Sequence, residues 1–238
     1  MATVSRGAHR RKRRPRAPLN RDRVLQAAVD LADREGIESL SMRRLGQELE
    51  VEAMSLYNHV ANKDEILAGI ADIVGSEIYL PPTRTGWRTA MRRRAISARD
   101  VFSRHPWLSS VLEAQIDPPV PATLRQHNAV IGNLRAGGFS LGAAAHAFSV
   151  LDCYIYGWAR QEVTLPFDTA DEVGGLAETS LAQLPRDEYP YIVEMITGHI
   201  LKPGYSYADE FEFGLDLILD ALEKLRDASG AAPARRSV

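Results

Sequence analysis

The chain has 238 residues, enough for one large domain or two small ones, and 45% of them are hydrophobic and 25% charged. This composition is typical of soluble globular proteins and excludes bulk disorder and fibrous classes. A lone cysteine, Cys153, excludes an internal disulfide, and no stretch reaches the roughly 18 apolar residues of a membrane span. We therefore expect an unprocessed, soluble protein of the reducing cytosol.

The net charge of −2 conceals an asymmetry along the chain. Residues 1–23 contain nine Lys and Arg and one acid, which gives +8 and leaves −10 for the remainder. A basic head on an acidic body favours a polyanion as the partner of the head, and the alternative is a solvated, self-repelling tail. Residues 1–18 lack an apolar period, so they predict a flexible basic arm.

Four short helices are predicted after the arm. Asn20 can cap the first, which ends near Gly36, Ser41 can cap the second, and Asn62 can open the fourth with a capping box. The third is a short segment over 53–59. Inward positions are Val24, Leu25, Ala28, Val29, Leu31 and Ala32 in the first helix, Met42, Leu45 and Leu49 in the second, Leu56 and Val60 around the third, and Ile66, Leu67, Ile70, Ile73 and Val74 in the fourth.

The rest of the chain is also predicted to be helical, because no alternating run argues for a sheet. Proline and glycine separate helices over 86–103, 106–115, 121–136, 140–163, 168–184, 189–200 and 208–226. The helices over 140–163 and 208–226 are apolar on more than one face. Such helices must be covered on two sides, and a partner subunit is the simplest second cover.

The second and third helices fit a helix-turn-helix, whose second helix enters the major groove of DNA. The inward residues Leu45, Leu49, Val51, Leu56 and Val60 leave an outer face of small, hydroxylated, aromatic and basic side chains, which suits base edges and phosphates. These outer residues are Arg43, Arg44, Ala53, Met54, Ser55, Tyr57, Asn58 and His59. The alternative is an ordinary helical hairpin with a polar outer face.

Specific motifs lie within residues 19–74: G-I-E-S-L before the second helix, R-x-L-x-x-x-L within it, S-L-Y-x-H-V in the third and N-K-D-E-I-L at the fourth. This stretch resembles the DNA-binding domain of TetR-family transcriptional regulators. The second half more loosely resembles the tetracycline-repressor branch, in G-W-R near Trp87, R-H-P-W-L at 104–108, L-R-A-G-G-F-S at 134–140 and Y-I-Y-G near Gly157.

The resemblance implies roles for the outer residues of the helix-turn-helix. Arg43 would reach a base edge or phosphate, Ala53 and Met54 would meet bases, and Asn58 would serve either. Phosphates would be held by Ser55, Tyr57, His59 and Lys63. Glu50 departs from the family, which usually has glycine in this turn, so a left-handed turn here costs about 1 kcal/mol unless the turn adopts another form.

The resemblance also implies a four-helix dimer interface and a small-molecule pocket in the body. The polar and aromatic candidates for the pocket are Arg92, Trp107, Gln115, His127, Asn128, Asp152, Tyr156, Trp158 and Gln161. For each, the alternative is an ordinary core or surface role, and Cys153 is expected to be a buried small hydrophobic residue. Tetracycline repressors hold a magnesium–drug chelate through a histidine of the sixth helix. Residues 107–116 contain none, so neither a metal nor a cofactor is expected.

We therefore predict an all-α protein with a three-helix DNA-binding head, joined by a fourth helix to a helical body. The predicted units are the arm at 1–18, the helix-turn-helix domain at 19–65, the ligand-binding and dimerisation domain at 66–227 and a disordered tail at 228–238. The predicted function is a cytoplasmic homodimeric repressor that a small-molecule effector releases from double-stranded operator DNA. A helical enzyme is disfavoured, because no catalytic or metal-binding motif is present. A helical protein whose arm binds a membrane or an acidic protein is the other alternative.

Overall fold

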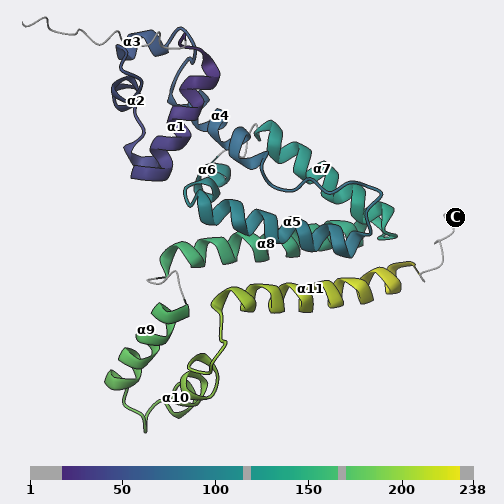
Figure 1. Ribbon diagram of the computed structural model, residues 1–238. Coiled ribbons are helices and arrows are strands. Elements are labelled where there is room, and N and C mark those ends of the chain that lie inside the picture. Colours follow the sequence, from purple (N-terminus) through teal and green to yellow (C-terminus); the bar gives the residue numbers. More distant parts are fainter. Residues whose placement is uncertain (1–17, 115–118, 166–169, 231–238) are drawn as a thin grey trace, which may run out of the picture.

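The computed structural model describes residues 18–114, 119–165 and 170–230, and within these ranges all regular structure is helical, as predicted. The elements are α1 (Arg21–Glu35), a 3₁₀ turn (Ile37–Ser39), α2 (Met42–Leu49), α3 (Ala53–Leu56), α4 (Lys63–Gly75), α5 (Trp87–Arg104), α6 (Leu108–Ala114), α7 (Pro121–Ala136), α8 (Leu141–Thr164), α9 (Ala170–Gln183), α10 (Pro190–Met195), a π-helical turn (Ile196–Ile200) and α11 (Tyr207–Gly230). Figure 1 shows a head of α1–α3, the connecting helix α4, a body of α5–α8 with α11, and a projecting pair, α9 and α10. None of the described helices is long and apolar enough to span a membrane.

The head is fixed by local capping and by a small apolar core. Oδ1 of Asn20 accepts from the amide of Arg23 at 2.9 Å, and Oδ1 of Asn62 accepts from the amide of Glu65 at 2.8 Å. The Glu65 carboxylate returns to the amide of Ala61 at 2.7 Å, one residue before the cap. Most of the predicted inward positions are buried, while Met42, Val51, Leu67 and Ile73 are partly buried against the same core. The local sequence signals therefore predicted this region correctly.

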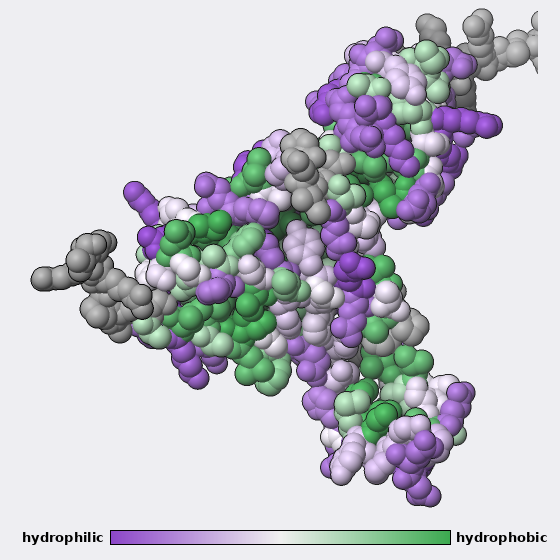
Figure 2. Space-filling view, turned by 180° about the vertical axis from the view of Figure 1, so that it is seen from behind, coloured by the Kyte–Doolittle hydropathy of each residue, from purple (hydrophilic) through white to green (hydrophobic). Residues whose placement is uncertain are grey.

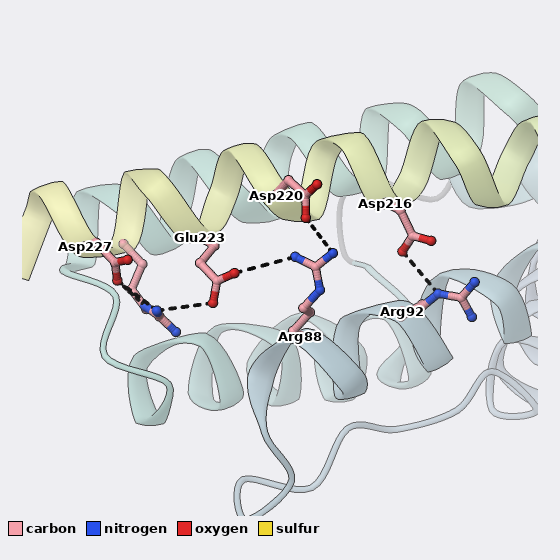
Figure 3. Close-up of polar contacts among 7 residues, drawn as sticks. Arg88, Arg92, Asp216, Asp220, Glu223 and Asp227 are labelled. Atoms are coloured by element: carbon pink, nitrogen blue, oxygen red, sulfur yellow. Dashed lines mark hydrogen bonds and ion pairs between the residues drawn. The ribbon is translucent and has the colours of Figure 1, made fainter.

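In the body, α8 packs against α5, α7 and α11. Two arginines of α5 form an ion-pair ladder with acidic residues of α11, as Figure 3 shows. Arg88 lies 2.6 Å from Asp220, and Arg92 lies 3.2 Å from Asp216. Because these side chains are about one-third to two-thirds exposed, each pair contributes little stability.

Two predictions about the body were wrong. Cys153 is exposed, not buried, because it faces away from the helices that pack on α8. The last helix continues to Gly230, three residues into the predicted tail, because each added residue extends the hydrogen-bonded ladder of an existing helix. Residues 1–17 of the predicted arm and residues 231–238 of the predicted tail lie outside the described residues.

Candidate DNA-binding and effector-binding sites

The turn between α2 and α3 adopts the left-handed backbone conformation, which is strained for a residue other than glycine. Glu50 adopts φ 54° and ψ 45°, and it is the only described non-glycine residue with positive φ. The amide of Val51 then donates to the carbonyl of Gly46 at 2.9 Å. A Cβ at Gly46 would lie 3.0 Å from the carbonyl oxygen of Val51, so this close approach requires glycine at position 46, while the strained position 50 carries Glu.

The turn presents an exposed surface at α3 and the start of α4. Met54 is 75% exposed and Tyr57 is 47% exposed, although both are large side chains that proteins commonly bury. Arg43, Asn58 and Lys63 are also exposed, whereas Ala53, Ser55 and His59 are half-buried. We call this set the recognition surface. Its chemistry, with apolar, hydroxyl and cationic groups on one protruding edge, suits contact with bases and phosphates.

The two adjacent arginines of α2 differ in their environment. Arg44 is half-buried, and its Nη2 binds the Glu35 carboxylate of α1 at 2.5 Å. The hydrogen bond from Arg44 lowers the pKa of Glu35, and the same contact raises the pKa of Arg44. Arg43 is exposed and makes no ion pair with another described residue. Arg44 therefore connects α1 to α2, and Arg43 is the better candidate for base contact.

A polar group lies inside the body where α5, α7 and α8 meet. Arg94 is 5% exposed, and its Nη1 binds Oδ1 of Asp152 at 2.8 Å. Nε2 of His127 lies 4.0 Å from the other oxygen of Asp152, and the His127 ring meets Phe148 edge-on at 4.8 Å. Nε of Arg94 has no hydrogen-bond partner among the described residues, so a buried donor is left available.

Burial changes the ionisation of two members of this group. Desolvation raises the pKa of Tyr156 to about 12, with a smaller contribution in the same direction from Asp152. Desolvation also lowers the pKa of His127, more than the nearby Asp152 raises it. Both side chains are therefore neutral at pH 7. They can exchange hydrogen bonds with a bound molecule without the cost of desolvating a charge.

Only some of the candidate effector-binding residues lie at this polar group. Three of the candidates, His127, Asp152 and Tyr156, lie together at this group. Arg94, which was not among the candidates, lies with them. A signal existed, because Arg94 lies on the apolar stripe of α5 between Met91 and Ala98 at helical spacing. Arg92 is in the ladder, Trp107 bonds to Asp33 of the head, Trp158 stacks on Tyr207, and Asn128 and Gln161 are exposed. Gln115 lies outside the described residues.

An apolar face of α8 and α11 is not covered by the chain itself. The exposed fractions are 45% for Val150, 64% for Phe213 and 56% for Leu217. Together with Cys153, we call these residues the uncovered α8–α11 face. Figure 2 shows hydrophobic residues gathered over the body. Exposed apolar side chains gathered in this way are typical of an interaction site.

Comparison with known proteins gives matches along most of the chain. Residues 24–70 match the family described as bacterial regulatory proteins, tetR family, and residues 80–226 match the tetracyclin repressor-like C-terminal domain. The HTH-type transcriptional repressor DrrR1 of Streptomyces coeruleorubidus is 34% identical over 229 residues, which cover 91% of this chain and 82% of that protein.

Solved structures agree with these matches. The apo crystal structure of ActR from Streptomyces coelicolor has a TM-score of 0.70 at 28% identity, and covers 90% of this chain and 99% of its own. The structure of ActR with actinorhodin has a TM-score of 0.68 at 29% identity, and covers 91% of this chain and 100% of its own. Among the described residues of our chain, no three His, Cys, Asp or Glu side chains are grouped to hold a metal ion.

Proposed function

Because the chain belongs to the TetR family of transcriptional regulators, which are DNA-binding proteins and not enzymes, we propose that it is a homodimeric repressor that a small molecule releases from operator DNA. The observation that carries the proposal is the pairing of two exposed surfaces on one chain. The recognition surface protrudes from the head, and the uncovered α8–α11 face lies on the body. The first suits a DNA groove, and the second suits a copy of itself.

A dimer gives the head its specificity. One α3 of four residues can contact only a few base pairs, so a single head has little sequence information. Two heads related by a two-fold axis would read two half-sites, which must lie about 34–36 Å apart to occupy successive major grooves. We propose that Arg43 and Met54 contact base edges, and that Tyr57 and Lys63 contact phosphates. The cytoplasm is the location that this function requires.

The effector is proposed to bind in the body beside Arg94, His127 and Tyr156. Arg94 Nε and His127 can supply hydrogen bonds, and Phe148 and Tyr156 supply aromatic faces, so the group favours a molecule with an aromatic surface and an acceptor oxygen. ActR has been crystallised with actinorhodin, which supports a small molecule as the effector of a protein with this fold.

The proposal is tested by selecting the fragments that the purified protein binds from the source genome. The expected result is an enriched inverted repeat whose binding exceeds that of scrambled DNA at the same salt concentration. The matched control is Tyr57→Ala combined with Arg43→Ala, which leaves the buried head core unchanged. Equal enrichment by the protein and this variant would refute the proposed recognition surface. Binding that depends on salt but not on sequence would favour a merely electrostatic partner.

A further inference from the structure

Five side chains connect the DNA-binding head to the body, and we call them the head–body junction. Asp33 lies in the last turn of α1, and Glu77 follows α4. Arg104 ends α5, and His105 and Trp107 flank Pro106 before α6 begins. The junction therefore joins α1 and the segment after α4 to the corner between α5 and α6.

A single oxygen of Asp33 carries the contact from α1. Its Oδ1 accepts from Nε1 of Trp107 at 2.6 Å and from Nδ1 of His105 at 2.8 Å. The two rings are buried, with 5% exposure for Trp107 and 8% for His105. Because a carboxylate only accepts, both ring nitrogens donate, and a buried donor is costly to leave unpaired. Movement of α1 away from this corner would leave two of them unpaired.

The same corner is also held from α4. Nη1 of Arg104 lies 2.8 Å from a carboxylate oxygen of Glu77, and 3.3 Å from Nε2 of His105. With the ring hydrogen placed on Nδ1 for the bond to Asp33, Nε2 of His105 can accept from Arg104. The contacts thus run continuously from Glu77 through Arg104 and His105 to Asp33 and Trp107. A head attached only through α4 could rotate about that helix, whereas a second attachment on α1 opposes the rotation.

We infer that Asp33 is a positioning residue that fixes the orientation of the DNA-binding head on the body. The inference rests on the proposed function in one respect: in a dimer, the orientation of each head sets the separation of the two recognition surfaces. The α5–α6 corner is then linked to the DNA-binding head through α1 as well as through α4. The sequence pattern favours Trp107 for the effector pocket and indicates no role for Asp33.

The matched variants are Asp33→Ala and Asp30→Ala. Both remove one negative charge from α1 and introduce the best helix former, but the Asp30 carboxylate is exposed and bonds only to Gln26 of its own helix among the described residues. Binding is measured on the selected operator and on operators one base pair longer or shorter. We expect Asp33→Ala to reduce the discrimination between these spacings by about three- to tenfold, the factor that the net free energy of one typical hydrogen bond corresponds to.

A variant that is merely less stable lowers affinity for all spacings by the same factor, so it leaves this ratio unchanged. The ratio should also be unchanged in Asp30→Ala. If Asp33→Ala discriminates between the spacings as well as Asp30→Ala does, the inference is overturned.

A second measurement does not depend on DNA. Nitroxide labels are placed on the exposed positions 38 and 136 through Glu38→Cys and Ala136→Cys in a Cys153→Ser chain, and labelled chains are diluted with unlabelled ones. Asp33→Ala is expected to broaden the distance distribution between head and body, and Asp30→Ala is not. A broadened distribution in a protein that selects no operator would refute the proposed function and support the inference. An unchanged distribution in a protein that selects its operator would support the proposed function and refute the inference.

Discussion

Leu217 of α11 offers the most direct test of the proposed dimer, because its side chain is 56% exposed in the single chain. Leu217→Ala removes three carbons, and at about 0.8 kcal/mol for each buried carbon a fully buried site would lose about 2.4 kcal/mol. Covering only the exposed fraction makes the loss about 1.3 kcal/mol per chain. A two-fold axis uses the residue twice, so the dimer should weaken by about 2.7 kcal/mol, which raises its Kd about 100-fold.

The control is Leu124→Ala on α7, where the leucine is 54% exposed but lies outside the uncovered α8–α11 face. Sedimentation velocity over a concentration series measures the dimer Kd of both variants and of the unaltered chain. If Leu217→Ala leaves the Kd unchanged, or if Leu124→Ala raises it equally, the assignment of this face to the dimer is refuted.

Four further predictions follow from the head and the body. Arg43→Ala should relax the preference at one base position by about 1–3 kcal/mol, whereas Tyr57→Ala should weaken all operator variants equally, and titrations against single-base variants distinguish these outcomes. Glu50→Gly should raise the free energy of unfolding by up to about 1 kcal/mol, because glycine relieves the left-handed strain, and a lower midpoint in urea would contradict this. Burial lowers the pKa of His127, so the unfolded chain binds more protons, and stability should fall as the pH drops through the unfolded pKa of about 6.5. His127→Gln should flatten that slope in thermal unfolding, and an unchanged slope would show that other groups cause it. Deleting residues 1–16, which lie outside the described residues, should weaken binding to all DNA nearly equally and reduce its salt dependence, and a changed site preference would contradict this.

The sequence determined the head almost completely, because its signals are local. Asn20, Ser41 and Asn62 cap their helices as predicted, since a cap bonds to an amide only a few residues away. The inward positions follow from helical periodicity within single segments, and the turn at Glu50 follows from the spacing of α2 and α3. The sequence also identified Glu50 as an unusual residue for this turn, and the structure decided that its backbone is left-handed.

Tertiary structure alone decided which charged and aromatic side chains meet. The contact of Asp33 with Trp107 joins residues 74 positions apart, and that of Arg94 with Asp152 joins residues 58 positions apart. No local pattern encodes such pairs, because they depend on the angles at which whole helices cross. The exposure of Cys153 has the same origin. Since α8 is apolar or small on several faces, periodicity could not say which face the chain covers and which face it leaves exposed.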